Sequence, residues 1–361
     1  MFFNFIFIYY GQEQKTPFAS KIKRWERVLH KQTNYFKGKK PSEKRHSKRL
    51  YTKLQNPSEL VAYFQPLMYM KMEFPETYKE YISNKREVFL KLAHVYSKKP
   101  NIERGCFADF ICSFPEVVAG AEDEISAILT SYIEGSSLHS RANVLRAVCA
   151  VGNSQGVTNV LRTVSGNSLF MHNHLMTNIL SSFNGDKLEL CKHLWHESQA
   201  WNDNVKVSVI QFIAKHSGDY KEEFLPVLRD PKTNVEVRTA IIRYYGRYPH
   251  DPVHTTLLNF IPNFESVNLM IRSTSALALY PEDDTAIALK AALYDTNWYV
   301  RYNASASLVQ LYDEVGLREM LRNETKHARE IVEYLLEREA LFVKTAAQED
   351  VIDSAMAPIR I

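Results

Sequence analysis

The chain has 361 residues, of which 45% are hydrophobic and 24% are charged, so it can bury a folded core and is not an intrinsically disordered protein. Only 12 glycines and 14 prolines are spread over this length, and strand-like alternation is scarce, which predicts an all-α fold. The four cysteines form no Cys-x-x-Cys pair, which excludes the dense disulfide framework of small secreted domains. We expect reduced, mostly buried thiols and, in the absence of a signal-peptide cleavage site, a cytosolic main body.

Residues 1–10, MFFNFIFIYY, are almost wholly apolar. A membrane-spanning helix needs about 20 apolar residues, so this run is too short to cross a bilayer by itself. We expect either an interfacial anchor or the end of a longer membrane helix that begins upstream of Met1. The alternative is a misplaced start with no membrane role.

Residues 11–54 carry the basicity of the chain. They hold 14 lysines and arginines against Glu13, Glu26 and Glu43, a balance of +11, although the whole chain is only +4. A basic stretch after an apolar run is typical of a cytoplasmic juxtamembrane arm that contacts an anionic membrane surface. The alternatives are a solvated linker and an electrostatic footprint for nucleic acid. The residues expected near the membrane include Lys21, Lys23, Arg24, Lys39, Lys40, Lys44 and Arg45.

The rest of the chain is predicted to form short helices. Residues 55–99 are expected to be N-terminal capping helices, and residues 100–315 contain a repeat of about 30 residues, which has room for two short helices and two turns. We predict a polar C-terminal capping helix in residues 316–345 and a tail in residues 346–361. One basic residue marks the second helix of each clear copy, and we name this set the cationic ladder: Arg141, His172, Lys206, Arg238, Arg272 and Arg301.

The most complete copy has the pattern Asp295-x-x-x-x-Val300-Arg301-x-x-Ala304-x-x-x-Leu308. With this pattern the chain resembles the HEAT-repeat family, especially its short bacterial repeats. The resemblance implies a right-handed α-α superhelix, or solenoid, of six or seven helical hairpins whose second helices line a concave, partner-binding face. The chain is also similar to membrane-anchored bacterial HEAT proteins, which are often encoded beside glycosyltransferases, so a membrane or glycosyltransferase-type protein is one candidate partner.

Two roles are open for the cationic ladder. Its members could form a basic stripe for phosphate or acidic peptides, or each could pair with an acid in the preceding turn and satisfy helix-end groups between repeats. We favour the structural role, with Asp295 paired to Arg301 and Asp230 paired to Arg238.

The later repeats contain an aromatic-rich stretch with Trp298 and Tyr299, in which Tyr244, Tyr245 and Tyr302 are candidate partner anchors. Core packing is the more common reason for aromatic residues at helical spacing.

His193 and His196 share one helical face and could join His172 and His174 in a metal cluster, but ordinary histidines explain them better. We therefore predict no metal site and no cofactor.

Enzymatic signatures are scarce. The sequence has no Gly-rich phosphate loop, no Gly-x-Ser-x-Gly elbow and no His-Glu-x-x-His, so we expect no enzyme. Our interpretation is a non-catalytic scaffold or adaptor that binds a protein partner on the cytoplasmic side of the membrane, with a purely cytoplasmic protein as the alternative location. The other function classes left open are a nucleic-acid-binding protein of the HEAT-like DNA glycosylase type and a repeat-type lyase or hydroxylase.

Overall fold

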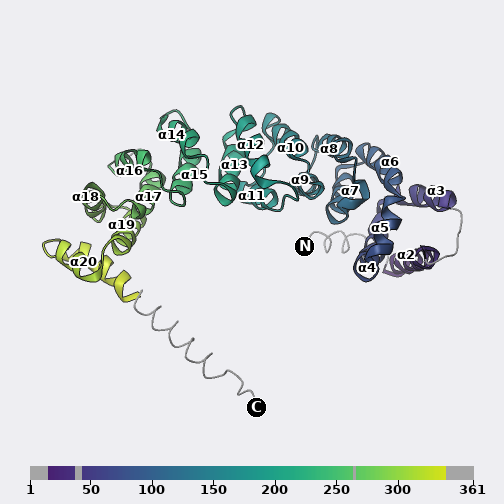
Figure 1. Ribbon diagram of the computed structural model, residues 1–361, viewed down its shortest axis with the longest axis horizontal. Helices are drawn as coiled ribbons and strands as arrows, with labels where there is room; N and C mark the ends of the chain where they lie inside the picture. The colour runs from purple at the N-terminus through teal and green to yellow at the C-terminus, as the bar shows by residue number, and fades with distance from the viewer. Residues whose placement is uncertain (1–14, 37–42, 263–265, 339–361) are drawn as a thin grey trace, which may run out of the picture. The chain divides into compact units, whose positions relative to one another are not determined.

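The structure is a computed structural model that describes residues 15–36, 43–262 and 266–338. These residues form helices joined by short turns, with no strand among them, so the predicted all-α class is confirmed (Figure 1). The chain divides into two compact units, Met1–His216 and Ser217–Ile361, which we describe separately.

The first unit begins with three helices that pack together. They are α2 (Lys15–Phe36), α3 (Glu43–Leu54) and α4 (Pro57–Glu73). Helix α2 packs on α4 and buries Phe18, Trp25 and Leu29, whereas α3 packs on α4 and α6 and buries Leu50 and Leu54. The interpretation of residues 11–54 as a linker is therefore wrong for these helices, because one face of each contributes to the core.

The remaining helices of the first unit form two rows. Helices that follow one another in a row contact each other, and most neighbours in sequence also pack as hairpins. The first row contains α6 (Arg86–Ser97), α8 (Glu122–Ser131), α10 (Ser154–Gly166) and α12 (Lys187–Ser198). The second row contains α7 (Asn101–Ser113), α9 (Leu138–Val151), α11 (Asn173–Ser181) and α13 (Asp203–His216). A short helix, α5 (Pro75–Ser83), follows α4, so residues 55–99 are helical as predicted.

The second unit repeats the same local arrangement. Each hairpin joins a first helix to a second helix, and consecutive second helices α15, α17 and α19 contact one another. The pairs are α14 (Lys221–Arg229) with α15 (Val235–Tyr245), α16 (His254–Phe260) with α17 (Val267–Ala276), and α18 (Asp283–Ala292) with α19 (Trp298–Leu311). The sequence periodicity therefore located the helices of both units.

Buried tyrosine hydroxyls tie neighbouring hairpins together. The Tyr132 hydroxyl donates to the backbone oxygen of Ala93 at 2.6 Å, and the Tyr96 hydroxyl donates to that of Leu54 at 2.8 Å. Each hydroxyl gains a hydrogen-bond acceptor in the core, so these tyrosines link successive elements.

The C-terminal region departs from the single capping helix predicted for residues 316–345. Helix α20 (Glu314–Met320) ends early, a turn occupies residues 321–324, and a second helix runs through residues 326–338. Thr325 starts this second helix, because its hydroxyl accepts a hydrogen bond from the backbone N–H of Ala328 at 3.4 Å. The predicted tail, residues 346–361, and the apolar run of residues 1–10 lie outside the described residues. Among the helices that are described, none is both long and apolar enough to span a bilayer.

Candidate functional site

Two arginines of the cationic ladder, Arg141 and Arg301, bind backbone carbonyls of turns. Arg141 donates from Nη1 to Ser136 O at 2.8 Å and from Nη2 to Phe170 O at 2.9 Å. Arg301 donates from Nη1 to the backbone oxygen of Asp295 at 2.7 Å and to that of Thr296 at 2.9 Å. These guanidinium groups therefore hold the turns that precede the second helices.

Arg238 also binds a backbone carbonyl, but its side chain is buried. It is 7% exposed, its Nε donates to Leu228 O at 3.0 Å, and its guanidinium carbon lies 4.8 Å from the centroid of the Phe260 ring. The predicted pairing of Arg301 with the Asp295 carboxylate is wrong in its acceptor, because Arg301 binds main-chain oxygens and Asp295 Oδ1 accepts from the backbone N–H of Asn297. The pairing of Asp230 with Arg238 stays a prediction. The structural role itself agrees with the geometry.

The other three residues of the cationic ladder, His172, Lys206 and Arg272, have different surroundings from one another. His172 precedes α11 as its N-cap, where Nδ1 accepts from the backbone N–H of His174 at 3.3 Å. Burial, and then the neighbouring Arg243, lowers the pKa of Arg272. Lys206 is partly exposed on α13. The six ladder residues therefore do not all make the same contacts.

Two of the three candidate aromatic anchors belong to the core. Tyr244 and Tyr245 are both fully buried; the Tyr244 hydroxyl accepts from the backbone N–H of Tyr220, and the Tyr245 hydroxyl donates to Lys221 O. Burial raises the pKa of Tyr244 to about 12, so its hydroxyl stays protonated. These two side chains cannot contact a partner, and the expectation that they do is wrong.

Tyr302 lies beside the exposed aromatic residues of the second unit. Its ring stacks on Trp298 with centroids 4.9 Å apart, and its hydroxyl accepts from Arg338 Nη1 at 2.6 Å. Trp298 is 48% exposed and Tyr299 is 62% exposed. A small pocket of about 260 Å³ opens there between α19 and residues 326–338. This end of the second unit thus keeps an aromatic surface that a protein could contact.

The histidine and cysteine residues show no assembled site. Among the described residues, no group of three or more His, Cys, Asp or Glu side chains could hold a metal ion. His193 and His196 lie on α12, where His193 Nε2 is 3.6 Å from Glu189 Oε1. The four cysteines form no disulfide and are mostly buried, as predicted, and burial followed by the nearby Asp109 raises the pKa of Cys112 to about 11.

Exposed positive charge gathers on α2 and α3. Lysines and arginines recur there at four-residue spacing, which places each set along one side of its helix. We name these exposed residues the basic face: Lys23, Arg27 and Lys31 on α2, and Lys44, Arg45, Lys48, Arg49 and Lys53 on α3. Like charges at this spacing destabilise a helix by about 0.2–0.5 kcal/mol per pair, so local helix stability does not explain them.

Not every predicted membrane-proximal residue belongs to the basic face. Lys21 donates to Ser58 Oγ at 2.7 Å, and Arg24 forms an ion pair with the largely buried Glu59, which also accepts from Trp25 Nε1 at 3.0 Å. These two cations dock α2 on the start of α4. Lys23, Lys44 and Arg45 are exposed, whereas Lys39 and Lys40 lie outside the described residues.

His46 does not add charge to the basic face. Burial, with Lys85 and Arg49 nearby, lowers its pKa to about 4. Its Nε2 lies 3.1 Å from the Tyr81 hydroxyl, which accepts from the Tyr63 hydroxyl at 3.0 Å. His46 is therefore neutral near pH 7 and joins α3 to the core by a hydrogen bond.

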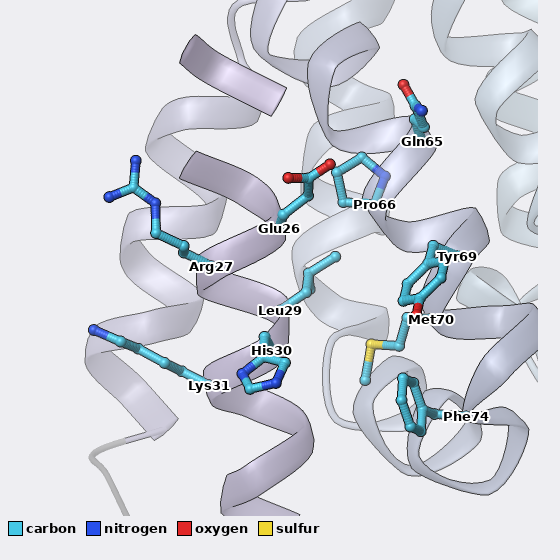
Figure 2. A pocket seen from close by; sticks show the side chains of 10 residues that line it. All are labelled: Glu26, Arg27, Leu29, His30, Lys31, Gln65, Pro66, Tyr69, Met70 and Phe74. Carbon is cyan, nitrogen blue, oxygen red and sulfur yellow. The ribbon is translucent and has the colours of Figure 1, made fainter. Parts of the chain in front are cut away.

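A groove of about 550 Å³ separates α2 from α4 next to the basic face, and we name it the α2–α4 groove (Figure 2). Leu29 from α2 and Met70 from α4 line its apolar floor, and Tyr69 and Phe74 form the α4 side. Glu26 and His30 stand along the α2 side, with the Glu26 carboxylate toward Pro66, whereas the side chains of Arg27 and Lys31 extend away from α4. Sequence reasoning found the basic residues but missed the groove, although the helical spacing of Phe18, Trp25 and Leu29 marks α2 as a packed helix.

This arrangement can bind a ligand or a surface. It combines an array of fixed positive charges with an apolar depression, which suits a ligand or surface that is both anionic and apolar. A scan against protein-family models and a search of curated proteins find no significant match to this chain.

Proposed function

We propose that this protein is a non-catalytic HEAT-like scaffold that associates with an anionic membrane surface through the basic face and holds a protein partner through its second helices. The observation that carries the proposal is the basic face itself: eight exposed lysines and arginines on two helices that are folded against the core. Because these helices are packed, the charges form a fixed array and little conformational entropy is lost on binding.

The energetics favour an anionic surface as the reason for this array. A lysine or arginine next to an anionic bilayer contributes about 1 kcal/mol, which exceeds the cost of about 0.2–0.5 kcal/mol for each like-charged pair on a helix. The membrane role of residues 1–10 remains part of the same proposal: an apolar segment and a basic patch together give stable association where either alone is weak.

The repeated hairpins support the scaffold role. Consecutive second helices contact one another in each unit, and carbonyl-binding arginines recur in the first turn of three of them, as expected of stacked HEAT-like repeats. A right-handed superhelix of six or seven hairpins is the arrangement that we propose for them. The exposed Trp298 and Tyr299 supply the kind of aromatic surface that protein partners bind.

Neutralising the basic face should weaken membrane binding without unfolding the protein. We expect Lys48→Gln to reduce partition of the full chain onto vesicles of phosphatidylcholine and phosphatidylglycerol about five-fold, and Lys44→Gln with Lys48→Gln about thirty-fold, since each charge contributes about 1 kcal/mol. Co-sedimentation with the vesicles measures the bound fraction of each variant. Removal of like-charge repulsion should leave urea stability unchanged or slightly raised.

Lys192→Gln is the matched control, because Lys192 is an exposed lysine on α12 outside the basic face. It should bind vesicles as the wild type does. If Lys192→Gln weakens binding as much as Lys48→Gln, net charge rather than the basic face is responsible, and the proposal fails.

A further inference from the structure

The α2–α4 groove presents apolar side chains to solvent. Tyr69 is 61% exposed on the α4 side, where its ring lies edge-on to the Phe74 ring with centroids 6.2 Å apart, and Met72 of the same helix is 72% exposed. The floor is firm, because Leu29 and Met70 are each almost fully buried. Covering such a surface with an apolar occupant is favourable, since it removes apolar area from water.

The charges around the groove favour an uncharged occupant. Glu26 is exposed and its carboxylate lies toward Pro66, whereas the side chains of Arg27 and Lys31 extend away from α4 (Figure 2). An anionic group in the groove would therefore meet Glu26 first. An uncharged apolar segment would leave the Glu26 carboxylate in water at the edge of the groove.

We propose that the α2–α4 groove holds residues 3–8 of this same chain when the protein is off the membrane, and that an anionic bilayer draws this segment out of the groove. The segment has the sequence FNFIFI, with no charged side chain and with Phe3, Phe5 and Phe7 at alternate positions. This inference rests on the proposed membrane association and adds to it a device that shields the apolar segment from water.

The chain is long enough for the segment to reach the groove. Helix α2 begins at Lys15, and Leu29 lies about 21 Å further along the helix at about 1.5 Å per residue. The chain from Phe7 to Lys15 spans up to about 26 Å when it is extended at about 3.3 Å per residue. A segment that turns back at the start of α2 therefore reaches Leu29 with Phe7 and with the residues before it.

The groove also matches a short extended segment in length. The α2 residues that line it run from Glu26 to Lys31, which is about 8 Å of helix. In an extended chain the side chains at positions i and i+2 point to the same side and lie about 6.6 Å apart. Two neighbouring phenylalanines of the alternating set, such as Phe5 and Phe7, therefore fit side by side along the groove.

Tethering favours this occupant over a second copy of the protein. A segment joined to its site by a short stretch of chain has an effective concentration of about the millimolar range. A separate molecule in dilute solution is present at a far lower concentration, so the segment of the same chain occupies the groove first.

Photo-crosslinking from the groove tests the occupant directly. Benzoylphenylalanine in place of Tyr69 keeps an aromatic ring on the groove wall, and the full chain is irradiated in dilute solution without vesicles. We expect mass spectrometry to find a crosslink within one chain between position 69 and residues 1–10. Vesicles that contain phosphatidylglycerol should lower the yield of this crosslink about five-fold at low salt, because the segment moves to the bilayer.

The matched control is benzoylphenylalanine in place of Phe170, which is 66% exposed in the stretch before α11 and should give no crosslink to residues 1–10. Absence of the crosslink at position 69, or its formation with a second copy or with another part of the chain, would overturn the docking. A yield that vesicles leave unchanged would overturn the release.

Proteolysis gives a second measurement of the docked state. Chymotrypsin cleaves after aromatic residues, and docking should protect those of residues 3–8. Tyr69→Ala removes an exposed part of the groove wall, so we expect it to raise the rate of cleavage within residues 1–10 about five-fold in solution. Phe170→Ala is the control and should leave this rate unchanged, and equal rates in the two variants would contradict the inference.

The vesicle experiments distinguish this inference from the proposed function. Tyr69→Ala keeps the basic face, so it should still sediment with anionic vesicles in a charge-dependent way. If that binding is present and the crosslink at position 69 is absent, the docking alone is contradicted. If the wild type shows no charge-dependent vesicle binding, the proposed function is contradicted.

Discussion

At the scale of single residues, Arg238 explains how a cation can recur in each repeat without binding a ligand. Its guanidinium is almost fully buried, donates to Leu228 O and lies over the Phe260 ring. A carbonyl at the end of a helix has no partner within that helix, so a guanidinium that reaches it from the next helix satisfies both groups. The side chain is therefore part of the packing between α14, α15 and α16.

Arg238→Met should consequently destabilise the protein. We expect a loss of about 2 kcal/mol in the free energy of unfolding, because a hydrogen bond from a charged donor is removed and Leu228 O is left without this partner. Urea denaturation of the second unit measures the change. Lys232→Met, at an exposed position in the turn before α15, is the control and should change stability by less than about 0.5 kcal/mol. Equal effects of the two variants would show that Arg238 is not structural.

The hydrogen-bond acceptor of Arg301 and the burial of Tyr244 and Tyr245 could not be predicted from the sequence. The position of Arg301 near Asp295 was readable from the sequence, but the acceptor was not, because every residue carries a carbonyl and its direction depends on the turn. Tyr244 and Tyr245 are adjacent, and a one-dimensional pattern does not show that both rings are buried and both hydroxyls bound to the backbone.

At the scale of elements, close approach between helices depends on particular glycines. A Cβ at Gly156 of α10 would lie 2.6 Å from Ser126 Cβ and 2.8 Å from Val148 Cγ1, so α8 and α9 both approach this point. Gly166, the last residue of the same helix, has no atom within 4 Å of its Cβ position.

These two glycines should respond oppositely to alanine. Gly156→Ala should destabilise the first unit by about 1–3 kcal/mol, because overpacking outweighs the gain of up to about 1 kcal/mol in helix propensity. Gly166→Ala should be neutral or slightly stabilising. Thermal unfolding followed by circular dichroism measures the change in stability of each variant. A stabilising Gly156→Ala would mean that α8, α9 and α10 do not pack as closely as described.

The elements most poorly predicted were those with the strongest charge. The second helices of the repeat region could be located because the cationic ladder marks them, and Arg238, Arg272 and Arg301 lie in α15, α17 and α19. In α2 and α3 the density of lysine and arginine suggested a linker, although Phe18, Trp25 and Leu29 follow helical spacing. The α2–α4 groove could not be predicted, because it depends on the distance between two helices and not on either sequence alone.

At the scale of the whole molecule, charge is divided along the chain. Residues 11–54, which include α2 and α3, carry a net charge of +11. The whole chain carries only +4, so the remainder of the chain is net acidic. Because a net acidic region is repelled by an anionic bilayer, the proposed membrane contact should be made by α2 and α3.

The partition of the full chain between vesicles and solution over a salt series tests the central claim most directly. The account predicts strong binding to phosphatidylglycerol-containing vesicles at low salt, weak binding to phosphatidylcholine alone, and progressive loss of the difference as salt approaches about 1 M, where the Debye length falls to about 3 Å. Equal, salt-independent binding to both kinds of vesicle would contradict the account. Complete displacement of the protein from anionic vesicles by a small excess of duplex DNA would also contradict it, because it would identify nucleic acid as the ligand of the basic face.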